Sequence, residues 1–385
     1  MGLNLYVDGR FGSFSTNRLD KKELETLITN GIESTRYLAV DESRMLADPA
    51  RYYKGGKPDL QLFDKKLYEV NPDDKVAIAR AAAEEVLGKD ERIISVDSSY
   101  SDGEGSSYRL ISNGFEGESK STWFSVSASV SIKGEGEARP QDYWYDSALF
   151  YDKLTKTGIG AKALERVLRK LGQKKAKSGK YTMVVDPMNV GNLLSPMLSA
   201  LYGSALQQKN SFLMDKLDTK VASDLFTLRD EPHAIGANGS RYFDNEGVAT
   251  EPRTVFDKGV LKTYFIDTYN GKKMDIAPTI SAPSRLILTL GDKDLNGLVA
   301  DIKQGILVTG FNGGNSNSST GDFSYGIEGF LIEDGKLTQP VNEMNVTGNM
   351  VTLWNSLVAV GNDPQPNRSW QIPSLVFEGV DFSGL

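Results

Sequence analysis

A strict alternation of apolar and serine side chains runs through residues 124–132, FSVSASVSI. Successive side chains of a β-strand point to opposite faces of the sheet. The apolar set, Phe124, Val126, Ala128, Val130 and Ile132, therefore occupies one face and the serines occupy the other. Such a strand belongs to a sheet that is buried on one side and solvated on the other.

Three segments in the first half of the chain predict helices, over residues 21–39, 72–88 and 160–172. The first follows Asn17 and Asp20, either of which can cap it. Its apolar residues recur at helical spacing and share one face: Leu24, Leu27, Ile28 and Ile32. An apolar helix is also expected from about 188 to 206, directly after the hydrophobic strand YTMVVDP.

Beyond that helix the chain consists almost entirely of short β-type segments separated by Gly, Asn and Asp. We therefore expect an α+β fold in two parts. Residues 1–178 form an N-terminal α/β domain with helices on a mixed sheet. Residues 179–385 form a C-terminal β-rich domain with many short antiparallel strands and the buried apolar helix.

Two acidic triplets in the second part, Asn245-Glu246-Gly247 and Asp257-Lys258-Gly259, raise the question of whether their carboxylates form a site. Glycine supplies positive φ at turns, and Asp or Asn bonds the local backbone. By this chemistry the triplets are corners between strands.

The inventory of side chains excludes several classes of chemistry. The chain has no cysteine and a single histidine, His233. Disulfides, iron–sulfur clusters, thiol nucleophiles and zinc sites with a thiolate or two imidazoles are excluded, and only carboxylate sites for magnesium or calcium remain. A net charge of −7 argues against direct binding to nucleic acid. No run approaches the ~20 apolar residues of a membrane span, and the first residues do not form a signal peptide, so we expect a cytoplasmic protein.

A few polar residues could line a cleft for a peptide or a partner. His233 could act as a general base, hold a substrate carboxylate, or simply be hydrogen-bonded in its loop. The Gly- and Asn-rich stretch 312–321 could present backbone N–H groups to an anion or a peptide carbonyl, or be a flexible loop. The candidates there and just beyond are Gly313, Gly314, Asn315, Asp322 and Ser324. A hydrolase would need a carboxylate pair, for which Asp322 with Glu328 or Glu333 is the candidate.

The order of several long motifs resembles the TldD/PmbA family, whose second member is also called TldE. These motifs are GSRYFDNEGVATEPRTVFDKGVLKTYFIDTYNGKKM, TGDFSYGIEGFLIEDGKLTQPV, VTGNM and VAVGND, with LNLYVDGRFGSFSTN and SGKYTMVVDP upstream. The resemblance covers essentially the whole chain. Family members usually carry a further strand and helix before the point that matches Gly2, so we expect an N-terminally short first domain.

The resemblance implies, for the catalytic TldD member, a zinc peptidase that acts on small or unfolded peptides. That member carries His-Glu-x-x-x-His after a Leu-Leu pair and a Cys near its C-terminus. Counted from Leu193-Leu194, the imidazole positions fall on Ser195 and Ala200, and the general-base carboxylate falls on Pro196. A hydroxyl, a methyl and a ring cannot hold zinc or activate water. The chain resembles the PmbA/TldE type, with no catalytic residue, no metal and no cofactor of its own.

The leading hypothesis is a non-catalytic subunit that pairs with a TldD-like metallopeptidase, where zinc is expected, and helps to hold an extended peptide. An alternative is a stand-alone peptide-binding or chaperone-like homodimer. A third is an indirect modulator of DNA gyrase, acting through the turnover of a toxin or antitoxin peptide. None of the three requires direct contact with nucleic acid or a membrane.

Overall fold

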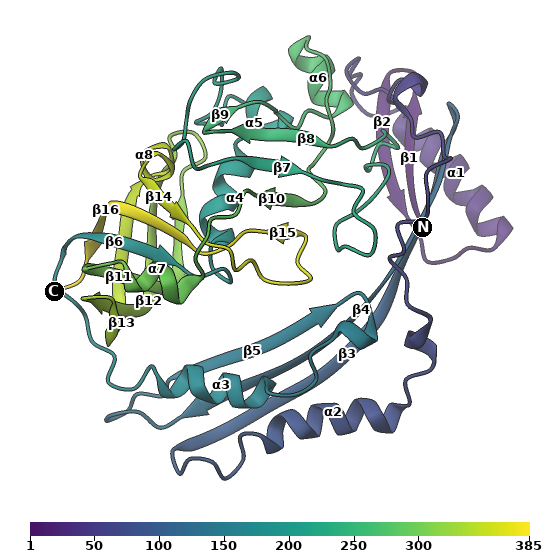
Figure 1. The fold of residues 1–385 in the computed structure, drawn as a ribbon. Coiled ribbons are helices and arrows are strands. Elements are labelled where there is room, and N and C mark those ends of the chain that lie inside the picture. The colour runs from purple at the N-terminus through teal and green to yellow at the C-terminus, as the bar shows by residue number, and fades with distance from the viewer.

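The computed structural model describes all 385 residues. The chain begins with an antiparallel hairpin of β1 (Gly2–Val7) and β2 (Arg10–Ser15), followed by α1 (Lys21–Thr35). Asp20 caps this helix, because its carboxylate accepts a hydrogen bond from the Glu23 backbone N–H at 3.0 Å. Figure 1 shows this unit at one corner of the molecule.

A loop with the short 3₁₀ helices η1 (Pro49–Arg51) and η2 (Lys65–Tyr68) leads to α2 (Pro72–Glu84). The central sheet follows, with β3 (Ile93–Ile111), β4 (Phe115–Ile132) and β5 (Gln141–Ala148), and then η3 (Tyr151–Lys153) and α3 (Ile159–Leu168). Both strand pairs are antiparallel, so the expectation of a mixed sheet in this part was wrong. Antiparallel neighbours need only short connections, and the chain supplies them as residues 112–114 after β3 and residues 133–140 after β4.

The alternation in β4 has the predicted consequence. Its apolar residues, from Phe124 to Ile132, are at most 1% exposed and pack with residues of α2 and α3. Figure 1 shows both helices on this face of the sheet, while the opposite face is turned toward the C-terminal part.

In the C-terminal part, five strands close into a ring. The strands are β6 (Gly179–Val185), β11 (Gln304–Ser316), β12 (Asp322–Glu333), β13 (Lys336–Asn349) and β16 (Leu375–Ser383). They pair in the order β13-β12-β11-β6-β16, and β16 pairs back with β13, while β14 (Leu357–Val360) flanks β16. The β6–β11 pair is parallel, and β11 to β13 have 12 to 14 residues each, so these strands are neither all antiparallel nor short as expected.

A second sheet has the order β15-β10-β7-β8-β9. Its strands are β7 (Leu228–Asp230), β8 (Arg253–Asp257), β9 (Val260–Leu261), β10 (Leu286–Leu288) and β15 (Trp370–Gln371). The helices of this half are α4 (Gly191–Ser199), α5 (Gly203–Gln207), α6 (Thr268–Met274), α7 (Leu295–Ala300) and α8 (Met350–Asn355). The observed fold is α+β, as predicted.

The apolar helix expected from 188 to 206 is divided into α4 and α5. Tyr202 is extended, with φ −74° and ψ 140°, and forms a parallel bridge with Phe265. The Gly203 N–H donates to the Phe265 carbonyl at 2.7 Å, so a tertiary partner replaces the helical bond. The apolar side chains of α4, from Leu193 to Leu198, are buried as predicted.

Both acidic triplets lie at turns. Asp257 ends β8 and Val260 begins β9, with positive φ at Lys258 and Gly259, as a tight hairpin turn requires. The chain reverses direction through the 245–247 triplet, and one antiparallel bridge joins Phe243 before the triplet to Ala249 after it. Among the helices, none combines the length and apolar character that crossing a membrane would need.

Candidate functional site

The candidate site begins with the solvated face of the central sheet. The register places Ser127 between Ser99 of β3 and Tyr145 of β5, and it places Ser129 opposite Tyr143. The two tyrosine rings stack with centroids 6.0 Å apart. This face therefore offers hydroxyl groups and aromatic rings without a large apolar patch.

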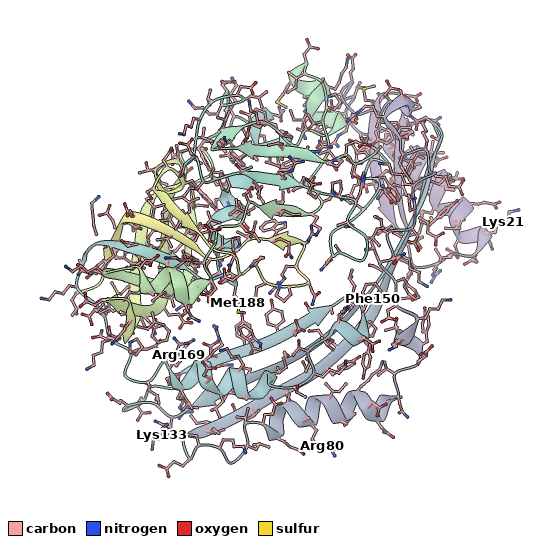
Figure 2. All side chains as sticks on the ribbon, viewed as in Figure 1. Lys21, Arg80, Lys133, Phe150, Arg169 and Met188 are labelled. Carbon is pink, nitrogen blue, oxygen red and sulfur yellow. The ribbon has the colours of Figure 1, made fainter.

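Loops of the C-terminal part meet this face. The Arg368 guanidinium, from the loop between β14 and β15, lies 4.9 Å from the centre of the Tyr145 ring. Burial lowers the pKa of Arg368, although the group stays charged. Figure 2 shows Met188 on the side of the C-terminal part that faces the central sheet, with Phe150 and Arg169 toward opposite ends of that sheet.

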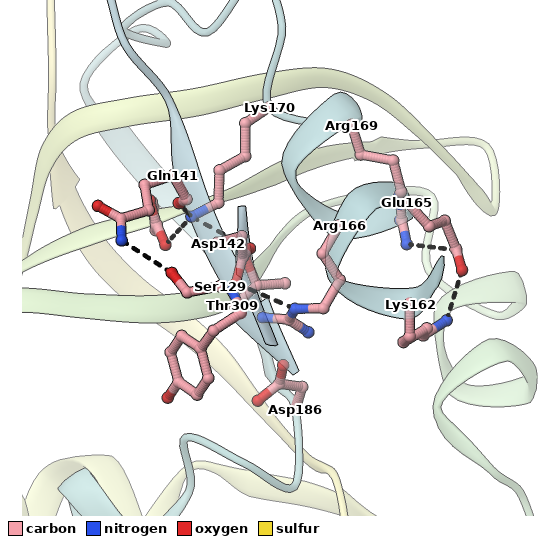
Figure 3. Close-up of polar contacts among 12 residues, drawn as sticks. Ser129, Gln141, Asp142, Lys162, Glu165, Arg166, Arg169, Lys170, Asp186 and Thr309 are labelled. Atoms are coloured by element: carbon pink, nitrogen blue, oxygen red, sulfur yellow. Dashed lines mark hydrogen bonds and ion pairs between the residues drawn. The ribbon is translucent and has the colours of Figure 1, made fainter. Parts of the chain in front are cut away.

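A buried charge network joins the two halves beside α3. Lys170 contacts the carboxylates of Asp142 on β5 and Glu328 on β12, at 3.1 and 2.7 Å. The Arg166 Nε lies 3.2 Å from Asp142. All four side chains are at most 17% exposed, so screening by water is weak. Figure 3 shows Arg166 of α3, and Lys170 just beyond the end of that helix, both reaching Asp142.

Asp186 lies close to this network, at the end of β6. Figure 3 shows the Arg166 guanidinium between Asp142 and Asp186. Burial raises the pKa of Asp186, while hydrogen bonds from Asn189 and the charge of Arg166 act in the opposite direction. The Asn189 side-chain amide donates to Asp186 at 2.7 Å and to the Thr309 carbonyl at 2.8 Å. These bonds fix the turn that leads into α4.

At the other end of the central sheet, a pocket of about 400 Å³ lies among the 53–62 loop, the 240–245 segment and strands β3 and β4. Tyr53 and Tyr242 stack there with centroids 5.2 Å apart. Arg109, Glu118 and Lys120 supply charges of both signs. The pocket can accept an extended segment that has polar and apolar groups.

The positions that matter for zinc lie on α4. Ser195 is exposed, Pro196 is half-buried and Ala200 is 1% exposed at the end of the helix. None of the three side chains can donate to zinc as an imidazole or carboxylate does. Nowhere in the chain do three His, Cys, Asp or Glu side chains gather as metal ligands would.

His233 and the glycine-rich hairpin make different contacts. The His233 Nε2 lies 3.0 Å from the Thr250 hydroxyl, and its ring packs 5.0 Å from that of Tyr242. Burial and the charge of Lys57 lower the pKa of His233, so the ring is neutral near pH 7. None of these contacts involves the hairpin.

In the hairpin, Gly313 and Gly314 have positive φ at a bulge of β11, and Asn315 pairs with Ser324 of β12. Asp322 accepts hydrogen bonds from Asn349 and Thr320, which lower its pKa. The hairpin end also contacts the 210–212 segment after α5, where the Phe212 N–H donates to Ser318. The structure brings these residues together but leaves His233 apart from them.

The suggested carboxylate pair does not form in the way a hydrolase requires. Glu328 is paired with Lys170, and Asp322 is held by its own hairpin. Asp322 and Glu333 are at opposite ends of β12.

Residues 178–384 match the PmbA/TldA metallopeptidase C-terminal domain, and residues 65–171 match the PmbA/TldA metallopeptidase central domain. The chain belongs to the PmbA/TldD family. It is 28% identical over 389 residues to a metalloprotease PmbA homolog of Haemophilus influenzae, covering 100% of this chain and 85% of that protein. It is 27% identical over 388 residues to metalloprotease PmbA of Escherichia coli O157:H7, with the same coverage.

Solved structures of similar proteins have the same fold. A Bacteroides thetaiotaomicron protein, provisionally named a modulator of DNA gyrase, superposes with a TM-score of 0.99 and is 73% identical, covering 100% of this chain and 88% of that chain. TldE from Thermococcus kodakarensis superposes with a TM-score of 0.82 at 22% identity, covering 98% and 88%. The second similarity establishes the fold alone.

Sequence reasoning missed the charge network and the tyrosines of this PmbA/TldD-family chain. The serine alternation in β4 identified the solvated face, but Tyr143 and Tyr145 lie on a different strand, β5. No local pattern joins Lys170 to Glu328, which are 158 positions apart.

Proposed function

We propose that this chain is a non-catalytic, PmbA/TldE-type subunit of a cytoplasmic metallopeptidase complex that processes small or unfolded peptides. Its TldD-like partner would carry the zinc. The observation that carries the proposal is α4, where Ser195, Pro196 and Ala200 stand at the positions that the family resemblance gives to two imidazoles and a carboxylate. The single His and the lack of Cys leave no substitute elsewhere.

We infer that the peptide lies extended between the central sheet and the C-terminal part. Strand β5 pairs with β4 only along residues 124–131 of β4. Just before them, the Thr122 N–H donates to the Leu62 carbonyl. Residues 116–120 of β4 therefore keep one backbone edge without a partner strand. Main-chain pairing at such an edge binds peptides largely independently of their sequence.

Coexpression with a TldD homologue tests the proposal. We expect a stable complex in size-exclusion chromatography and peptide cleavage that depends on the partner's His-Glu-x-x-x-His helix. A partner variant with Gln in place of the Glu of that helix should keep the complex and lose cleavage. Failure of the two chains to associate, with self-association and peptide affinity of this chain alone, would favour the homodimer.

The isolated chain provides a second test. We expect no peptidase activity with or without added zinc, and no change of melting temperature with a chelator, because metal that supported the fold would add stability on binding. Zinc-dependent cleavage that follows the pure protein through chromatography would overturn the proposal.

A further inference from the structure

A polar pocket of about 350 Å³ lies next to the free edge of β4. Its walls come from the central sheet and from C-terminal loops, and they include Leu62, Ser121, Ser240, Arg241 and Ser284. Arg241 is the only charged residue that lines the pocket. A pocket with one cation and no acid has the charge that suits a small anion.

The protein holds the Arg241 guanidinium in place, but not all of its N–H donors have a hydrogen-bond partner. Its Nε donates to the Ser284 hydroxyl at 2.8 Å, and one Nη donates to the carbonyls of Ala282 and Pro283. The other Nη makes no hydrogen bond and is not among the buried unpartnered atoms, so it is open to solvent. A guanidinium held in this way loses little side-chain entropy when it binds an anion.

Arg241 forms no ion pair with a carboxylate. Its charge does act on the buried Asp230, where it opposes the rise of the pKa that burial causes. The nearby Asp230 is 2% exposed, and its carboxylate accepts hydrogen bonds from the backbone N–H groups of Ser284 and Arg285, both at 2.9 Å. The free donors of Arg241 therefore remain available to a ligand.

The pocket continues into the larger pocket beside β4. Leu62, Ser240 and Arg241 line both, and the larger one also includes Glu118, Ser119 and Lys120 at the free edge. A strand paired with that edge would thus run beside Arg241. The hydroxyl of Ser121, the next residue of β4, has no hydrogen-bond partner in the protein and lines the smaller pocket.

We propose that Arg241, with the hydroxyl of Ser121, binds a carboxylate group of the peptide, either its C-terminal carboxylate or an Asp or Glu side chain. The assignment rests on the proposed peptide-binding function. A guanidinium and a hydroxyl can both donate to one carboxylate, and the guanidinium supplies the charge-assisted bonds. Peptides that lack a carboxylate should consequently bind less tightly.

The first experiment measures binding by isothermal titration calorimetry with an unlabelled, N-acetylated hexapeptide of Ala, Gly and Val, as the free acid and as the C-terminal amide. We expect the amide to bind about tenfold more weakly. An amidated version with one internal Glu tests the other source of the carboxylate, because restored affinity would assign the pocket to an acidic side chain. Equal affinity of all three peptides would overturn the carboxylate site but leave peptide binding intact. No binding of any of them at millimolar concentration would overturn both.

A matched pair of variants locates the effect. Ser121→Asp places a carboxylate in the pocket and leaves the contacts of Arg241 with the 282–284 segment intact. We expect it to weaken binding of the carboxylate-bearing peptide at least tenfold more than Ser121→Asn does, because Asn has the shape of Asp without its negative charge. Equal effects of the two variants, or equal losses for the free acid and the amide, would refute a carboxylate at this position.

Discussion

Gly259 and Gly88 have nearly the same φ angle but different surroundings. Their φ angles are +76° and +74°, a region that costs other residues about 1 kcal/mol or more. A Cβ at Gly259 would lie 2.0 Å from the Ala222 carbonyl oxygen, whereas one at Gly88 would meet nothing within 4 Å. We expect Gly88→Ala to cost about 1 kcal/mol of unfolding free energy and Gly259→Ala clearly more, measured by urea denaturation. Equal losses would mean that the turn can move away from Ala222.

At the scale of elements, the first acidic triplet anchors a helix as well as turning the chain. The Glu246 carboxylate accepts hydrogen bonds from the backbone N–H and hydroxyl of Thr268, the first residue of α6. Burial nevertheless raises the pKa of Glu246 above its usual value near 4.5. The folded state then holds this proton more tightly than the unfolded state does, so the contribution of Glu246 to stability falls as pH rises through the raised pKa. Glu246→Gln removes this titration. The unfolding free energy of the variant minus that of the parent should therefore increase from pH 4.5 to neutral pH in denaturation series. A difference that decreases over this range would contradict the role of burial.

At the scale of the whole molecule, Lys170 links the central sheet to the C-terminal ring. Glu328 has no other cation within ion-pair distance, while Asp142 keeps Arg166. Lys170→Met should therefore leave Glu328 partly buried and unpaired, at a cost of about 3 kcal/mol of unfolding free energy. Adding Glu328→Gln to that variant should recover part of the loss, because the unpaired charge is removed. Thermal and chemical denaturation of the parent and the two variants measure both effects. A full loss in the double variant would assign Lys170 a packing role alone.

The sequence by itself determined features that depend on residue identity or on short spacing. Period-two alternation in β4 decided which face is buried, because strand geometry alone sends alternate side chains to opposite faces. A helix cap just before Lys21, left open between Asn17 and Asp20, and the Asp257–Gly259 turn follow equally from local backbone chemistry. The lack of Cys and of a second His decided which zinc sites the chain cannot build.

Only the tertiary structure decided how these pieces combine. The ring closes because β16, at the end of the chain, pairs with both β6 and β13, and Phe265 divides the predicted helix at Tyr202. Arg241 became a candidate carboxylate-binding residue because its guanidinium donates to carbonyl and hydroxyl oxygens in the fold and forms no ion pair with a carboxylate. Each of these outcomes is a contact between distant segments. Local spacing does not specify such contacts, because their free energy arises only when packing brings the segments together.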